Sequence, residues 1–129
     1  MNTLATLRGQ VQDALTAAGM TVEDHLPERL APPLAIIAAG SPYLEGGATF
    51  GSYTARFTVV LVCPSGTNAT VTKALDATVT QAVVALDEAG FGLERVDQPT
   101  MLQHGNGHYL STSLDVRRDV EAIDDGQSN

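Results

Sequence analysis

The chain has 129 residues, a single cysteine and a formal net charge of −8, from 15 acidic and 7 basic side chains. This length predicts one domain with a sizeable core, and one cysteine excludes an internal disulfide. The acidity argues against a protein that grips nucleic-acid phosphates, because such proteins need a basic patch. The sequence has no bilayer-length apolar run and no basic-then-apolar leader, so we expect a soluble protein that is not exported.

The first predicted element is an amphipathic helix over residues 3 to 18, where apolar side chains recur every three or four residues. Asn2 or Thr3 can cap its start, and Gly19 suits a left-handed C-terminal cap. Prolines exclude a continuous helix over residues 20 to 33, so we expect a short extended piece at 21 to 23 followed by a loop. The helical stripe comprises Leu4, Leu7, Val11, Ala14, Leu15 and Ala18.

Two strands follow. Residues 34 to 39 predict a brief apolar strand, which we expect Gly40, Ser41 and Pro42 to end. Residues 52 to 63 alternate in polarity, as a strand with one buried face does. The pair is expected to be antiparallel, with the intervening loop, residues 41 to 50, projecting beyond the sheet. The predicted buried face of the second strand comprises Tyr53, Ala55, Phe57, Val59 and Leu61.

The second half predicts a helix followed by a hairpin. From residue 68 the period becomes helical, with a stripe at Leu75, Val79, Ala82, Val83, Leu86 and Ala89. Residues 93 to 97 and 100 to 104 read as extended, and Pro99 between them indicates a sheet edge or a bulge. Asn106 between two glycines predicts a tight turn, from which residues 108 to 116 return. Residues 119 to 129 read as a flexible acidic tail.

These elements predict an α+β fold: a single, mostly antiparallel sheet of four to five strands, with two helices packed on one face. Residues 1 to 118 form the one domain, ahead of the tail. The opposite sheet face and the loop carry apolar side chains that need a partner, namely Tyr43, Leu44, Phe50, Val60 and Val62. We therefore expect a closed, symmetric homo-oligomer.

No catalytic or metal-binding arrangement is visible. His104 and His108 flank the predicted turn and could meet across it, but they lack a third ligand. Cys63 ends an apolar strand, where a buried and inert thiol is expected. No nucleophile motif or phosphate-binding loop occurs. We expect neither an enzyme nor a bound metal or cofactor.

Several segments, taken in order, resemble the tail terminator proteins of long-tailed bacteriophages, particularly those that infect actinobacteria. The most specific are Pro32-Pro33-Leu34 opening a strand and Gly40-Ser41-Pro42-Tyr43-Leu44 closing it. The likeness runs over residues 4 to 118 and leaves the acidic tail outside. The other segments are Ala17-Ala18-Gly19, Val22 to Pro27, the strand 57 to 62, the helix from Asn68, and the hairpin ending at Asp115-Val116.

The resemblance implies a non-enzymatic virion protein of the tail and neck, assembled in the host cytoplasm. Its members form hexameric rings that cap the tail tube, end its polymerisation and present a surface to the head-side connector or stopper. The implied partners are sibling copies, the major tail tube protein and that connector, while DNA passes through the lumen without specific binding; no membrane is involved. We place the interfaces at Tyr43, Leu44, Glu45, Phe50, Asn106 and His108.

Two alternatives stand beside this interpretation. Another neck component, a head–tail stopper or tail-completion protein, would have similar size and character. A small cytoplasmic ligand-binding domain of the α+β class is the alternative outside the virion. Association with tail tubes separates the first two from the third.

Overall fold

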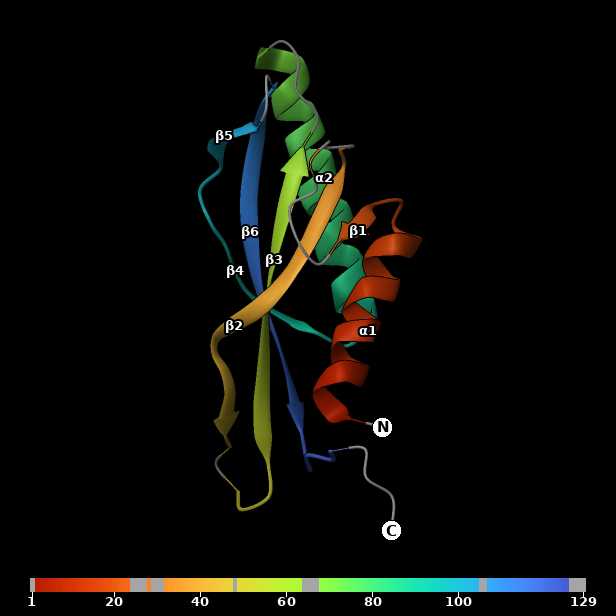
Figure 1. Ribbon diagram of the computed structural model, residues 1–129, viewed down its shortest axis with the longest axis vertical. Coiled ribbons are helices and arrows are strands. Elements are labelled where there is room, and N and C mark those ends of the chain that lie inside the picture. Colours follow the sequence, from red (N-terminus) through yellow and green to blue (C-terminus); the bar gives the residue numbers. More distant parts are fainter. Residues whose placement is uncertain are drawn as a thin grey trace.

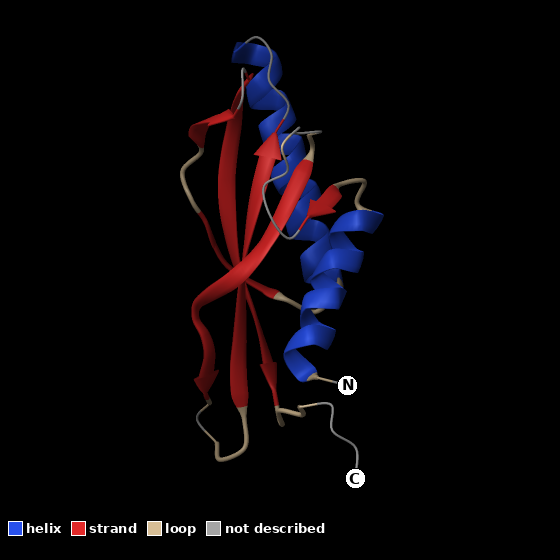
Figure 2. Cartoon of the chain, in the orientation of Figure 1, coloured by secondary structure: helices blue, strands red, loops and turns tan. Residues whose placement is uncertain are grey.

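The computed structural model describes residues 2–23, 28, 32–47, 49–63, 68–104 and 107–125 (Figure 1). Two helices and six strands succeed one another along the chain (Figure 2). In order they are α1 (Thr3–Ala17), β1 (Thr21–Glu23), β2 (Leu34–Gly46), β3 (Tyr53–Cys63), α2 (Asn68–Glu88), β4 (Gly92–Val96), β5 (Thr100–His104) and β6 (Gly107–Val120).

The strands form one sheet in the order β1-β2-β3-β6-β4, with β5 also paired to β6. Only the β1–β2 pair is parallel. The expected α+β class and mostly antiparallel sheet are therefore confirmed, with six strands in place of four to five. Both helices lie on the same side of the sheet (Figures 1 and 2). β4 and β5 share one edge of the sheet, on either side of Pro99.

The core lies between the two helices and the sheet face beneath them. β3 is its centre, because alternate side chains from Ala55 to Leu61 are fully buried there, as the alternation predicts. α1 and α2 bury their apolar stripes against this face, and β6 adds Leu114 and Val116. The helix residues that are buried there are Leu7, Val11, Leu15, Ala82 and Leu86.

The predicted ends of α1 are present. The Asn2 side-chain oxygen accepts a hydrogen bond from the Ala5 backbone N–H at 3.0 Å, which satisfies one of the donors that a helix start leaves open. Gly19 has φ of 93° just after the helix, a conformation that suits glycine. From there the chain turns directly into β1, which pairs with the start of β2.

The first strand of the pair is longer than expected. Gly40, Ser41 and Pro42 do not end β2, which continues to Gly46 and pairs again with β3 from Leu44 onward. The register shifts between Ala39 and Leu44. The residues that we expected to end the strand lie within this irregularity, and the strand continues beyond them. Pro42 lies within the shift, where a missing backbone donor costs no ladder hydrogen bond.

The last strand is also longer than expected. β6 runs to Val120, so Asp119 and Val120, which we expected in the acidic tail, belong to the sheet. The reason is that β3 offers a partner along this whole length, ending with Tyr53 opposite Val120. Asp125 forms an isolated bridge with Asn2, and residues 126–129 lie outside the described part.

The β5–β6 hairpin is present, but its two histidines are not opposite each other. The register places Gln103 opposite His108 and pairs His104 with Gly107. Residues 105 and 106, and with them the predicted turn and interface residue Asn106, lie outside the described residues.

Candidate interaction surface

One half of the sheet face that carries no helix is apolar and already packed. Leu34 and Val62 are fully buried there, with Ile36, Leu102 and Tyr109 against them. Val62 is therefore not available to a partner, contrary to expectation, because β2, β5 and β6 contribute side chains that pack around it. This half of the face needs no sibling copy to hide it.

The other half of this face is a polar layer that joins four strands. Arg56 on β3 donates to Glu45 Oε1 of β2 at 2.9 Å and to Glu94 Oε1 of β4 at 3.0 Å. The hydrogen bond to Glu45 and the charge of Glu94 raise the pKa of Arg56. Both carboxylates therefore pair with one guanidinium, which links β2 to β4 across β3 and β6.

A second arginine continues this layer. Arg95 lies 2.8 Å from Asp115 Oδ2 and 3.2 Å from Asp97 Oδ1, and both acids help to raise its pKa. Asp115 also accepts from the Thr58 hydroxyl at 2.8 Å, and Asp97 accepts from the Ser113 hydroxyl at 2.8 Å. Each of these carboxylates has a donor in place, so the layer is a hydrogen-bonded network that links the strands.

The sheet ends in a projecting hairpin, which we refer to as the β2–β3 arm, residues 40–47 and 49–56. In Figure 1 its turn lies at the lower end of the molecule, beyond both helices. The turn is held by backbone bonds from Gly47 N–H to Ser52 O (2.8 Å) and from Ser52 N–H to Thr49 O (3.0 Å). Phe50 on this turn is completely exposed, at 105% of its reference area. Phe50 is thus a large apolar side chain that its own chain leaves uncovered.

Tyr43 lies on the arm and is partly buried. Its ring meets Phe57 edge to face, 5.7 Å between centroids, and its hydroxyl accepts from an Arg8 guanidinium N–H at 3.0 Å. Arg8 also donates to the Ile37 carbonyl at 3.3 Å, beside the point where β1 stops pairing with β2. Tyr43 therefore packs against the core and anchors the arm, and its place in an interface stays a prediction.

The remaining predicted interface residues that the structure describes are exposed but do not form one cluster. Leu44, Glu45 and Phe50 lie on the arm. His108 lies at the start of β6, which runs antiparallel to β3, so it is at the other end of the sheet from the arm. The structure thus separates the two predicted interface regions into opposite ends of the molecule.

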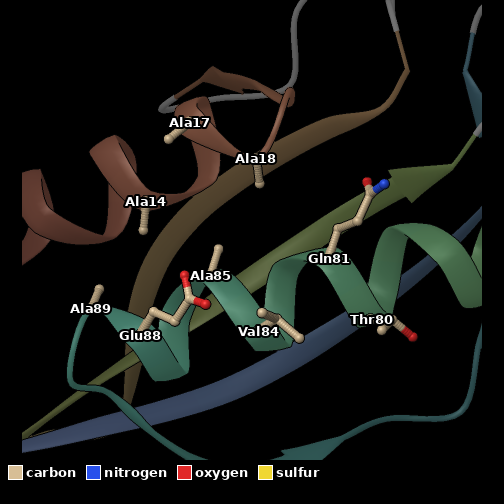
Figure 3. Close-up of a pocket in the computed structure, with 9 residues that line it drawn as sticks. All are labelled: Ala14, Ala17, Ala18, Thr80, Gln81, Val84, Ala85, Glu88 and Ala89. Carbon is tan, nitrogen blue, oxygen red and sulfur yellow. The ribbon is translucent and has the colours of Figure 1, made fainter.

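Sequence reasoning missed a groove of about 550 Å³ between α1 and α2, lined by nine residues. Ala14 of α1 and Ala18, just after that helix, face Ala85 of α2 and Ala89, just after that helix, across the groove (Figure 3). Alanines spaced four apart on both helices were the signal, because they keep the facing sides of the helices shallow. The rest of the lining is Ala17, Thr80, Gln81, Val84 and Glu88, so only one lining side chain is charged.

Reactive groups are sparse in the described part of the chain. Cys63 is buried at the end of β3, and this burial raises the pKa of its thiol, as an inert cysteine requires. Among the described residues no group of three His, Cys, Asp or Glu side chains is placed to hold a metal ion. No helix in that part is long and apolar enough to cross a bilayer.

No protein-family model matches the chain, and a search of curated proteins also finds no match.

Proposed function

We propose that the protein is a structural virion component that forms a ring on the last layer of a phage tail tube. The ring stops tube polymerisation and presents a surface to the head-side connector. The β2–β3 arm carries this proposal, because it extends an exposed aromatic side chain, Phe50, beyond the rest of the fold. A projecting turn with an exposed aromatic side chain suits contact with a neighbouring protein.

The charge of the chain supports the same function. Six copies at −8 each carry −48 in total, an acidic field around a central channel. Such a field repels the DNA backbone and keeps the passing genome from sticking to the wall. The sheet face without helices carries five carboxylates, namely Glu45, Glu94, Asp97, Asp115 and Asp119, of which Arg56 and Arg95 pair the first four.

The two separated interface regions also suit a ring between two different neighbours. The arm lies at one end of the sheet and the β5–β6 hairpin, with His108, lies at the other. One end can then meet the tube while the other faces the head-side connector. Contacts between sibling copies close the ring, as cyclic assemblies with head-to-tail interfaces do.

The test is where the purified protein binds. Gold-labelled protein is mixed with purified tail tubes and with head-side connectors from the same phage, and both are imaged by electron microscopy. We expect label at one end of each tube and none along its length. Label on isolated connectors with bare tube ends would contradict the proposal and indicate a head–tail stopper. Absence of label from both would exclude a neck protein altogether.

A further inference from the structure

Two surface features of this chain are complementary in shape and lie apart in the molecule. Phe50 protrudes, fully exposed, from the turn of the β2–β3 arm. The groove between α1 and α2 is open, apolar and lined largely by alanine. In Figure 1 the turn lies beyond the start of α1, whereas the groove lies at the C-terminal end of that helix. The chain therefore cannot fill its own groove with its own Phe50.

We infer that the α1–α2 groove of one copy receives Phe50 from the arm of the next copy. This inference rests on the proposed ring and names the contact that closes it. The groove volume of about 550 Å³ falls within the range of pockets that enclose small apolar ligands, so it has room for one benzyl side chain. The phenyl group of Phe50 would have apolar walls on both sides of the groove (Figure 3). These walls are Ala14, Ala18, Ala85 and Ala89.

Charge restricts where two copies can meet. Copies at −8 repel one another, so a contact between them forms best where ionisable side chains are absent. Residues 47 to 52, the turn of the arm, contain none. The groove contains one, Glu88, among nine lining residues. Insertion of the turn into the groove therefore brings in no ionisable side chain from residues 47 to 52 and meets one, Glu88, at the groove wall.

The area of this contact favours a ring over a pair. A phenylalanine side chain buries roughly 150–250 Å², whereas a stable pairwise interface buries roughly 1,200–2,000 Å². One inserted side chain alone is therefore too little to hold two copies together. A knob and a groove on different parts of one chain make a head-to-tail contact, so each copy in a closed circle engages two neighbours. Closure then makes each contact intramolecular and strengthens all of them.

Sedimentation equilibrium of the full chain measures this contact. Phe50→Ala, which removes the knob, and Ala17→Trp, which fills the groove from an exposed position, each raise the concentration for half-assembly about tenfold or more. Met101→Ala is the matched control, because Met101 is an exposed apolar side chain (65%) on β5, away from both features. An unchanged assembly for both test variants, or an equal loss for Met101→Ala, overturns the inference.

Disulfide trapping gives a second readout that does not depend on affinity. Oxidation of Phe50→Cys/Val84→Cys protein is expected to produce a ladder of covalently linked chains, since Val84 lines the groove and Cys63 is buried. Phe50→Cys/Met101→Cys protein is the control and is expected to give no linked species beyond a dimer. A control ladder of the same length, or no ladder in the test protein, contradicts the inference. Ladders from a protein that never binds tail tubes would instead refute only the proposed function.

Discussion

Gly40 of β2 lies against the backbone of Arg56 on β3 so closely that a Cβ added to it would fall 2.5 Å from Arg56 Cβ and 2.7 Å from its carbonyl carbon. No real side chain fits at such distances, so β2 can approach β3 this closely here only with glycine. This close approach lies where the register shifts and the arm begins. It also sets Arg56 between Glu45 and Glu94. The arm therefore depends on this one backbone contact.

Replacing Gly40 with alanine tests that dependence. We expect Gly40→Ala to lower the free energy of unfolding by about 1–3 kcal/mol, because the added methyl group meets backbone and Cβ atoms and cannot be avoided by rotating a side chain. Denaturant unfolding monitored by circular dichroism measures the change. The control is Gly9→Ala in α1, where nothing lies within 4 Å and helix propensity predicts a gain of up to about 1 kcal/mol. Equal stability of wild type and Gly40→Ala would refute the close contact.

Tyr43 and Phe50 lie on the same arm but should respond differently to truncation. Tyr43→Ala removes the ring packed on Phe57 and the acceptor of Arg8, so we expect a loss of about 2 kcal/mol in unfolding free energy. Phe50→Ala removes a side chain that touches nothing in its own chain, so the stability of the isolated chain should change by less than about 0.5 kcal/mol. Thermal unfolding at low protein concentration compares the two. A larger loss for Phe50→Ala than for Tyr43→Ala would show that the assignment of core and surface is reversed.

The Cys63 thiol should be inert in the folded protein. Burial raises the pKa of this thiol above the value of about 8.5 that it has in an unfolded chain. The folded state therefore holds the proton over a pH range in which the unfolded state loses it, and folding stability falls as pH rises above about 8.5. We expect a thiol reagent at pH 8 to label Cys63 only after denaturant is added. Stoichiometric labelling of the native protein would contradict this burial.

The elements that bury one face were predicted correctly from the sequence, because their apolar side chains recur with the period of a strand or a helix. The alternation from Ala55 to Leu61 and the stripes of both helices match the buried residues, because the helices cover only one side of the sheet. The extent of β2 was not predictable from local signals. Gly40 and Pro42 read as a strand end, and only the partner strand β3 shows that a register shift accommodates them.

The candidate surface was predicted only in part. Phe50 was expected to be exposed and is, whereas Tyr43 is only partly exposed and packs against the core. Its partner Arg8 is 35 residues away in sequence, so no local pattern could indicate the contact. The groove depends in the same way on how α1 and α2 approach each other, which the stripes do not fix.

The central claim, that this protein ends tail-tube growth, is tested most directly by the length of tubes assembled with and without it. Purified tail tube protein is polymerised alone and with increasing amounts of the chain, and tube lengths are measured by electron microscopy. The account predicts tubes of uncontrolled length in its absence and progressively shorter, capped tubes in its presence. A length distribution that does not respond to the added protein, at concentrations where the protein is folded, would contradict it.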